Sequence, residues 1–150
     1  MSDIINNECT GCLVARGEVG ASIFETEHFI LNQDAEVPLK GFLIVTSKKH
    51  VNSLIDFNEN EVEELSSLLY KARKALSDLN ICNEVTIVQE ERSKHFHIWL
   101  FPYYDWMQEK FGKGIKYLRD INEYVIENAT EEDKSETLDT IEKLKEYFNK

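Results

Sequence analysis

Alternating apolar and polar positions recur between residues 21 and 101 and predict short β-strands separated by polar turns. Five apolar runs fit this pattern, at residues 21–24, 28–31, 42–46, 84–89 and 95–101. Pro38 and Gly41 precede the third run and mark its entrance, because both residue types favour turns. This part of the chain therefore predicts a sheet of short strands.

A different period, with an apolar residue every three or four positions, begins after the third run. It predicts one amphipathic helix of about 18 residues. The Glu-rich start and the basic second half of this segment also suit the helix dipole. The apolar positions are Val62, Leu65, Leu68, Leu69, Ala72 and Leu76.

After Pro102, two charged segments at residues 108–128 and 131–149 return to helical spacing and predict a helical hairpin. Thr130 is placed to cap the second helix, with Asp133 three residues further on. We therefore expect an α+β domain at residues 1–106 and a helical extension at 107–150. The extension either covers an edge or face of the sheet, which we favour, or forms a lid or dimer arm beside a pocket.

Composition and charge narrow the possible partners. The 150 residues suffice for one domain with a hydrophobic core. A net charge of -11 argues against the backbone of DNA or RNA as the main ligand, but it leaves room for a small phosphorylated ligand in a local pocket. No apolar run reaches the roughly 18–20 residues of a membrane span. The first residues lack the features of a secretory signal, and three cysteines suit a reducing compartment, so we expect a cytoplasmic protein.

The segment HFHIWLFP, residues 95–102, places two histidines in an apolar run. Strand alternation puts His95, His97 and Trp99 on one face and a purely apolar set on the other. Imidazoles on one face each need a hydrogen-bond partner. Three interpretations remain open for this pair, which are structural histidines, metal ligation and phosphate chemistry.

The C-x-x-C motif of Cys9 and Cys12 has the spacing of half a zinc site. With His50, which follows the third run, and one of the strand histidines, it completes a Cys₂His₂ set of the kind that zinc prefers. The alternative for His50 is a residue that ends the strand or caps a helix.

Taken in order, these features resemble the histidine-triad superfamily of nucleotide-binding hydrolases and transferases. That superfamily is marked by a strand of alternating histidines followed by proline, and HFHIWLFP matches its first two histidines and the proline. The segment NQDAEVPLKGFLIVTSKKH resembles a second signature, with an acidic residue, proline, glycine, a strand and a basic pair before histidine. The resemblance covers roughly residues 8–103 and implies an antiparallel sheet with one main packed helix.

The resemblance also implies roles for individual residues. His97 matches the nucleophile that attacks the α-phosphate and forms a nucleotidyl-histidine intermediate. Asp34 matches the residue that binds ribose hydroxyls, and its alternative is a solvated loop aspartate. A structural zinc ion is implied by the zinc-containing members of the superfamily. Their ligands correspond to Cys9, Cys12, His50 and His95.

Two parts of the pattern differ from the superfamily. Trp99 stands in place of the third histidine and offers one N–H donor and no acceptor. The loop QEERSKH carries Arg92 where a hydroxyl residue is usual, with Ser93 beside it. We expect Arg92, Ser93 and Trp99 to contact the ligand, and their alternatives are surface charges and packing.

The leading expectation is therefore a hydrolase or nucleotidyl transferase acting on a dinucleoside polyphosphate or nucleoside phosphoramidate. The alternative is a zinc-containing nucleotide-binding module with impaired catalysis. A third interpretation makes the histidines and cysteines structural, in a protein-interaction domain. The resemblance further implies a homodimer joined through the main helix and an edge strand.

Overall fold

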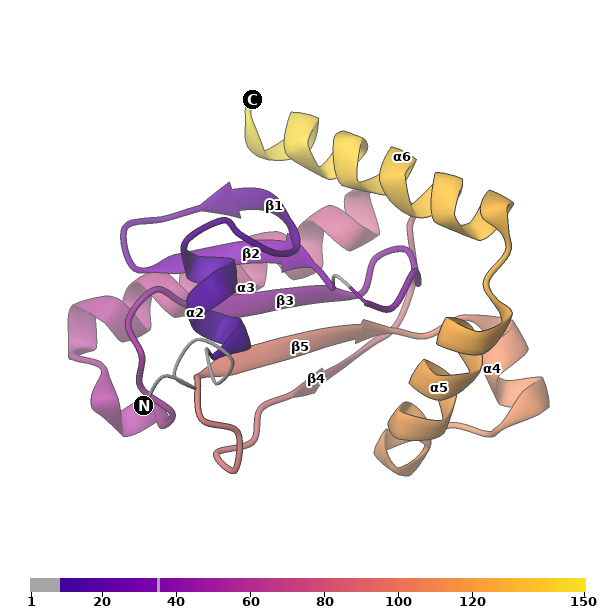
Figure 1. Cartoon of the computed structure of the whole chain (residues 1–150). Helices are drawn as coiled ribbons and strands as arrows, with labels where there is room; N and C mark the ends of the chain where they lie inside the picture. Colours follow the sequence, from indigo (N-terminus) through magenta and orange to yellow (C-terminus); the bar gives the residue numbers. More distant parts are fainter. Residues whose placement is uncertain (1–8, 35) are drawn as a thin grey trace.

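The strands form one antiparallel sheet in the order β1-β2-β3-β5-β4 (Figure 1). They are β1 (Ala21–Glu25), β2 (Phe29–Gln33), β3 (Leu43–Ser47), β4 (Val85–Val88) and β5 (His97–Pro102). This computed structural model describes residues 9–34 and 36–150. All five predicted strands are therefore present, and the α+β fold class is confirmed.

Helices cover both faces and one edge of the sheet. They are α2 (Thr10–Ala15), η1 (Leu54–Asp56), α3 (Glu59–Asp78), α4 (Asp105–Lys110), η2 (Ile115–Tyr117), α5 (Leu118–Asn128) and α6 (Glu131–Phe148). The segment predicted as one helix over 108–128 is interrupted, because Gly112 and Gly114 adopt φ values of 118° and 116° that no α-helix accommodates.

The start of the histidine strand differs from the prediction, since β5 begins at His97 and not at His95. The Phe96 N–H donates to the Val51 carbonyl at 2.6 Å, and the Ser47 N–H donates to the Phe96 carbonyl at 3.2 Å. The chain therefore bends before it joins the sheet. As a result His95 is buried, whereas the side chain of His97 is half-buried.

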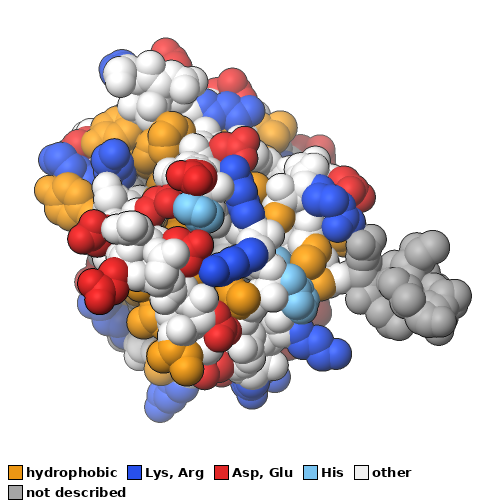
Figure 2. Space-filling view, turned by 90° about the vertical axis from the view of Figure 1, so that its left-hand side faces the viewer, with side chains coloured by type: hydrophobic (Ala, Val, Ile, Leu, Met, Phe, Trp, Pro, Cys, Tyr) orange, Lys and Arg blue, Asp and Glu red, His pale blue; other side chains and the backbone are white. Residues whose placement is uncertain are grey.

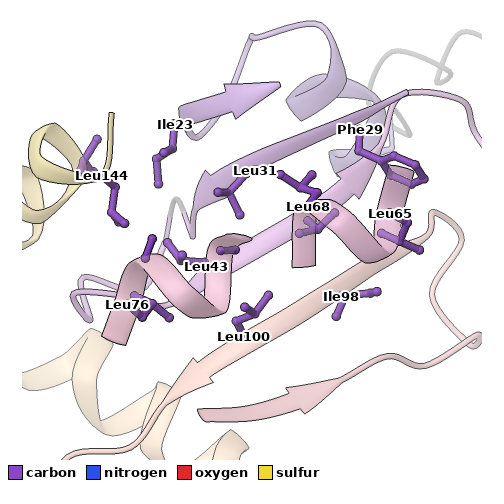
Figure 3. Close-up of a cluster of buried hydrophobic side chains, with 14 of the residues drawn as sticks. Ile23, Phe29, Leu31, Leu43, Leu65, Leu68, Leu76, Ile98, Leu100 and Leu144 are labelled. Atoms are coloured by element: carbon purple, nitrogen blue, oxygen red, sulfur yellow. The ribbon is translucent and has the colours of Figure 1, made fainter. Parts of the chain in front are cut away.

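Helix α3 packs on one face of the sheet and buries the main core (Figure 3). Its N-terminus is held by a capping box, in which the Asn58 side chain accepts from the Glu61 N–H and the Glu61 carboxylate accepts from the Asn58 N–H. The buried side chains of this layer include Phe29, Leu31, Leu43, Leu65, Leu68, Leu76, Ile98 and Leu100.

The opposite face of the sheet carries the candidate chemistry. In the register, Ile30 pairs with Thr46, and Thr46 with His97. Toward the other end of β5, Phe42 and Phe101 on this face pack under α4 and α5 in a second apolar cluster. Helix α2 lies against β2 and β3 (Figure 1).

Helix α6 returns along the body and contacts β1, the edge strand (Figure 1). Phe148 stacks on Phe24 with ring centroids 4.9 Å apart, and the Tyr147 hydroxyl donates to Asp78 on α3 at 2.7 Å. Thr130 and Asp133 form the predicted capping box. The C-terminal helix thus covers a sheet edge, as favoured from the sequence. Within residues 9–34 and 36–150, no helix combines the length and apolar character needed to cross a membrane.

Candidate functional site

Two cysteines and two histidines converge where α2 meets the segments that flank β3 and β5. The Nδ1 atom of His95 lies 3.3 Å from the Cys9 sulfur, 3.6 Å from the Cys12 sulfur and 3.3 Å from Nδ1 of His50. The Cys12 sulfur is also 3.3 Å from Nδ1 of His50. All four donor atoms lie within 4.8 Å of one another, which is the separation expected of ligands around a single ion. We call this group the Cys/His centre.

The ring of His95 is held in one tautomer. Its Nε2 lies 2.7 Å from the Ser47 carbonyl oxygen, which can only accept, so Nε2 carries the proton. Nδ1 therefore presents its lone pair to the sulfur atoms. Burial lowers the pKa of His95 and keeps the ring neutral, as metal ligation requires. The donor set of two sulfurs and two imidazole nitrogens fits tetrahedral zinc.

Glycine is needed at position 11, between the two cysteines, because there is no room for a side chain next to the His95 ring. The residue lies inside helix α2. A Cβ atom at this position would stand 2.2 Å from Cγ of His95. Only glycine therefore lets the helix approach the imidazole closely enough to bring both sulfurs to it.

His97, the predicted nucleophile, lies on the face of the sheet away from the main core. Its Nδ1 lies 2.9 Å from the carbonyl oxygen of His95, and because that oxygen only accepts, Nδ1 carries the proton. In the neutral ring Nε2 therefore carries the lone pair. The residue whose ring joins the Cys/His centre thus also orients His97 through its backbone.

Asp34 follows β2 and interacts electrostatically with His97. Its Oδ1 accepts the N–H groups of Glu36 and Val37, each at 2.8 Å. No described residue donates to Oδ2. Burial is the main cause that raises the pKa of this carboxyl group. Asp34 is therefore a partly buried acceptor and not a freely solvated loop residue.

The loop before β5 is anchored in a way that the sequence did not reveal. The Glu91 carbonyl accepts from the Asn52 side chain at 2.9 Å, and its carboxylate accepts from the Ser53 hydroxyl at 2.8 Å. The hydroxyl of Ser93 donates to the His95 carbonyl at 3.1 Å. Arg92 is 74% exposed at its side chain and forms an ion pair with Glu90 at 2.8 Å. Ser93 thus points at the strand backbone, whereas Arg92 points into solvent.

Trp99 lies on the same face as His97, two residues further along β5. Its ring meets Phe42 edge-on with centroids 5.1 Å apart, and it is tilted against Phe101 at 6.2 Å. The tryptophan is only partly buried. It therefore combines a packing role with an aromatic surface beside the candidate site.

The residues that sequence reasoning missed act mostly through the backbone. The Ser47 carbonyl fixes the tautomer of His95, and a carbonyl carries no residue-specific signal. Basic side chains beside histidines also appear on the face shown in Figure 2, in a protein of net charge -11. Lys48 and Lys49, which precede His50, are each paired with a glutamate.

Comparison with known proteins agrees with the fold. No protein-family model matches the chain. An uncharacterised HIT-like protein of Methanocaldococcus jannaschii is 28% identical over 116 residues, which cover 70% of this chain and 88% of that protein.

Two solved structures extend the likeness to nearly the whole chain. A zinc-bound histidine triad family protein from Mycobacterium smegmatis matches with a TM-score of 0.65 at 15% sequence identity. The match covers 95% of this chain and 94% of that protein's chain. A hypothetical histidine triad nucleotide-binding protein from Sulfolobus tokodaii has a TM-score of 0.65 at 18% identity and covers 94% of this chain and 92% of its own. The predicted resemblance is confirmed.

Proposed function

We propose that this histidine-triad-like protein binds a nucleoside phosphate and hydrolyses it, or transfers its nucleotidyl group, with His97 as the nucleophile. The observation that carries the proposal is the 2.9 Å contact between Nδ1 of His97 and the His95 carbonyl. That contact directs Nε2 away from its backbone partner, and in the neutral ring Nε2 carries the lone pair. A neutral imidazole fixed in one tautomer is suited to attack phosphorus.

The reaction proceeds in two displacements. Nε2 of His97 forms a bond to the α-phosphorus while the bond from phosphorus to the leaving group breaks, and the leaving group takes a proton from solvent. Water or a second phosphate then attacks phosphorus, breaks the P–N bond and restores the neutral ring. During the first step the ring becomes positively charged, and the hydrogen bond from Nδ1 to the His95 carbonyl stabilises that charge.

Asp34, Arg92, Ser93 and Trp99 form the proposed substrate-binding set. Oδ2 of Asp34 would accept from the ribose hydroxyls, because Oδ1 already accepts two N–H groups. Arg92 would exchange Glu90 for a phosphate, an exchange of small cost because an exposed ion pair contributes at most about 1 kcal/mol. Trp99 would wall the ligand pocket, and Ser93 would hold the strand backbone beside the phosphates.

Cys9, Cys12, His50 and His95 would hold a structural zinc ion. The fit rests on the donor set and on the lone pair that His95 Nδ1 directs at both sulfurs. The metal would fasten α2 and the segment after β3 to the start of β5. We also propose a homodimer joined through α3 and the edge strand β4, on which Ile87 is 54% exposed. The proposed location is cytoplasmic.

A turnover assay tests the proposal. Zinc-loaded protein is incubated with labelled dinucleoside polyphosphates and nucleoside phosphoramidates, beside His97→Ala and the exposed α3 control Ser67→Ala. We expect product from wild type and from the control, a loss of at least 1,000-fold in His97→Ala on the order expected for a nucleophile, and a trapped nucleotidyl adduct on His97 by mass spectrometry. Equal rates for wild type and His97→Ala would refute the role of His97.

A nucleotide-binding module without turnover is the second candidate, and two observations favour it. Trp99 stands in the position of a third histidine and packs against Phe42, and Arg92 is engaged by Glu90. Within residues 9–34 and 36–150, the site then has no evident donor for the charged transition state. Nucleotide binding by calorimetry, together with equally negligible product from wild type and His97→Ala, would establish this candidate.

A further inference from the structure

The loop between β4 and β5 carries two members of the proposed substrate-binding set, Arg92 and Ser93, at the same end of the sheet as α2 (Figure 1). This loop lies beyond the pairing of the two strands that it joins, because that pairing ends at Val88 and Trp99. Contacts from outside the β4–β5 pair must therefore hold the loop in shape.

Three consecutive residues after β3 hold the loop at both of its ends. The Val51 carbonyl accepts the N–H of Phe96 at 2.6 Å. The Asn52 side chain donates to the Glu91 carbonyl at 2.9 Å, and the buried hydroxyl of Ser53 donates to the Glu91 carboxylate at 2.8 Å. We call these three hydrogen bonds the loop clamp.

One end of the loop clamp fixes the direction of the carbonyl that orients His97. The N–H of Phe96 and the carbonyl of His95 belong to one peptide group, which is planar and trans. The N–H and the carbonyl of such a group point in opposite directions, so the bond from Phe96 to Val51 aims the His95 carbonyl away from Val51. That carbonyl accepts from Nδ1 of His97 at 2.9 Å. The tautomer of His97 therefore depends on the position of the loop relative to the segment after β3.

Glu91 closes the other end of the loop clamp through its side chain. The Ser53 hydroxyl that donates to it also accepts the Ile55 N–H at 3.2 Å, as the cap of η1. A hydrogen bond to an ionised carboxylate is stronger than one between neutral groups. Glu91 is exposed, so the packing of a core does not explain its place. Its carboxylate ties the loop to the capped turn of η1.

We propose that Glu91 is a positioning residue, which ties the loop to Ser53 and thereby keeps His97 in its Nδ1-protonated tautomer. The inference rests on the proposed function of His97 and adds the residue that keeps its ring aligned. Glu91 acts through the backbone of the loop and not by contact with the ligand. Without its bond to Ser53 the loop shifts, and a nucleophile that is displaced from the phosphorus reacts more slowly.

The nitrogen resonances of His97 test the proposal without any assay of turnover. They are recorded on ¹⁵N-labelled protein at about pH 8, where an ordinary imidazole is neutral. We expect two well-separated resonances in wild type, for protonated Nδ1 and unprotonated Nε2. In Glu91→Ala the separation should shrink by about half or more, because the ring then exchanges between tautomers. Glu91→Gln keeps an oxygen that accepts from Ser53, so it should retain the wild-type separation.

Turnover supplies a second readout. We expect kcat to fall about 10-fold in Glu91→Ala and KM to stay within about twofold, because the alignment of the nucleophile matters in the transition state. Glu91→Gln should restore kcat. Glu63→Ala is the control, since it removes the same charge from an exposed residue of α3 outside the loop.

The two readouts separate this inference from the proposed function. A wild type without turnover would refute the proposed hydrolase or transferase, whereas the nitrogen resonances would still decide the role of Glu91. Unchanged resonances in Glu91→Ala would overturn the proposal. An equal change in Glu91→Gln would also overturn it, because the charge and not the hydrogen bond to Ser53 would then be responsible.

Discussion

The two imidazoles of His95 and His28 are each fixed by one oxygen, yet their surroundings give them opposite charge preferences. His95 donates to a neutral carbonyl and is buried, and burial lowers its pKa. His28 bonds to the carboxylate of Glu64, and this bond raises its pKa. A carbonyl and burial favour the neutral ring, whereas a carboxylate favours the protonated ring.

At the Cys/His centre, burial favours the neutral ring that metal ligation requires. At the His28 cluster, formed by His28 with Glu27, Glu61 and Glu64, the carboxylates favour the protonated ring, so the contribution of His28 to stability should depend on pH.

Removal of the sulfurs should have the largest effect. Cys9→Ser/Cys12→Ser should reduce zinc from one equivalent to none at the Cys/His centre and lower the free energy of unfolding by about 4 kcal/mol at a zinc concentration 1,000 times the Kd. Metal analysis and chemical denaturation measure these quantities, with the buried Cys82→Ser as a control outside the centre. Zinc retained by the double variant but lost in His97→Ala would make His97 a ligand and exclude it as the nucleophile.

Gly11→Ala should damage the same centre by steric means alone. The new methyl group would collide with the His95 ring, so we expect a loss of about 1–3 kcal/mol in unfolding free energy and weaker zinc binding. Thr10→Ala, on the exposed side of the same helix, is the matched control. Equal zinc affinity in Gly11→Ala and wild type would show that the close approach of α2 is not needed for the metal.

The pKa of His28 is raised and that of His95 is lowered, so their contributions to stability should change with pH in opposite directions. The raised pKa of His28 adds stability that is complete below about pH 6.5, the unfolded value, and is lost as the pH rises through the folded value. The stability difference between wild type and His28→Gln should therefore be largest in acid and shrink toward alkaline pH. Urea unfolding from pH 5.5 to 8.5 measures it, and parallel profiles would contradict the assignment.

Ser93→Ala should have the smallest effect. The substitution removes one of two donors to the His95 carbonyl and leaves the bond from His97 in place. We expect at most about a fivefold change in turnover, since a single neutral hydrogen bond contributes about 1 kcal/mol. A loss as large as that of His97→Ala would assign the hydroxyl a direct role at the phosphate.

Most of the fold could be predicted from local periodicity in the sequence. The spacing of Leu65, Leu68 and Leu76 predicted α3, and Thr130 with Asp133 predicted the start of α6, because caps and amphipathic faces are local properties. The same reasoning placed the start of β5 at His95 and left the helix over 108–128 unbroken. Both differences arise from backbone conformation, in the bend before His97 and in the positive φ of Gly112 and Gly114.

The sequence by itself determined the sheet, the main helix, the resemblance to the histidine-triad superfamily and the candidate residues Cys9, Cys12, His50 and His95. Only the tertiary structure decided which nitrogen of each imidazole faces its partners, because that depends on carbonyl and carboxylate oxygens distant in the chain. The His28 cluster likewise joins residues more than thirty positions apart. Long-range packing, and not local pattern, brought those atoms together.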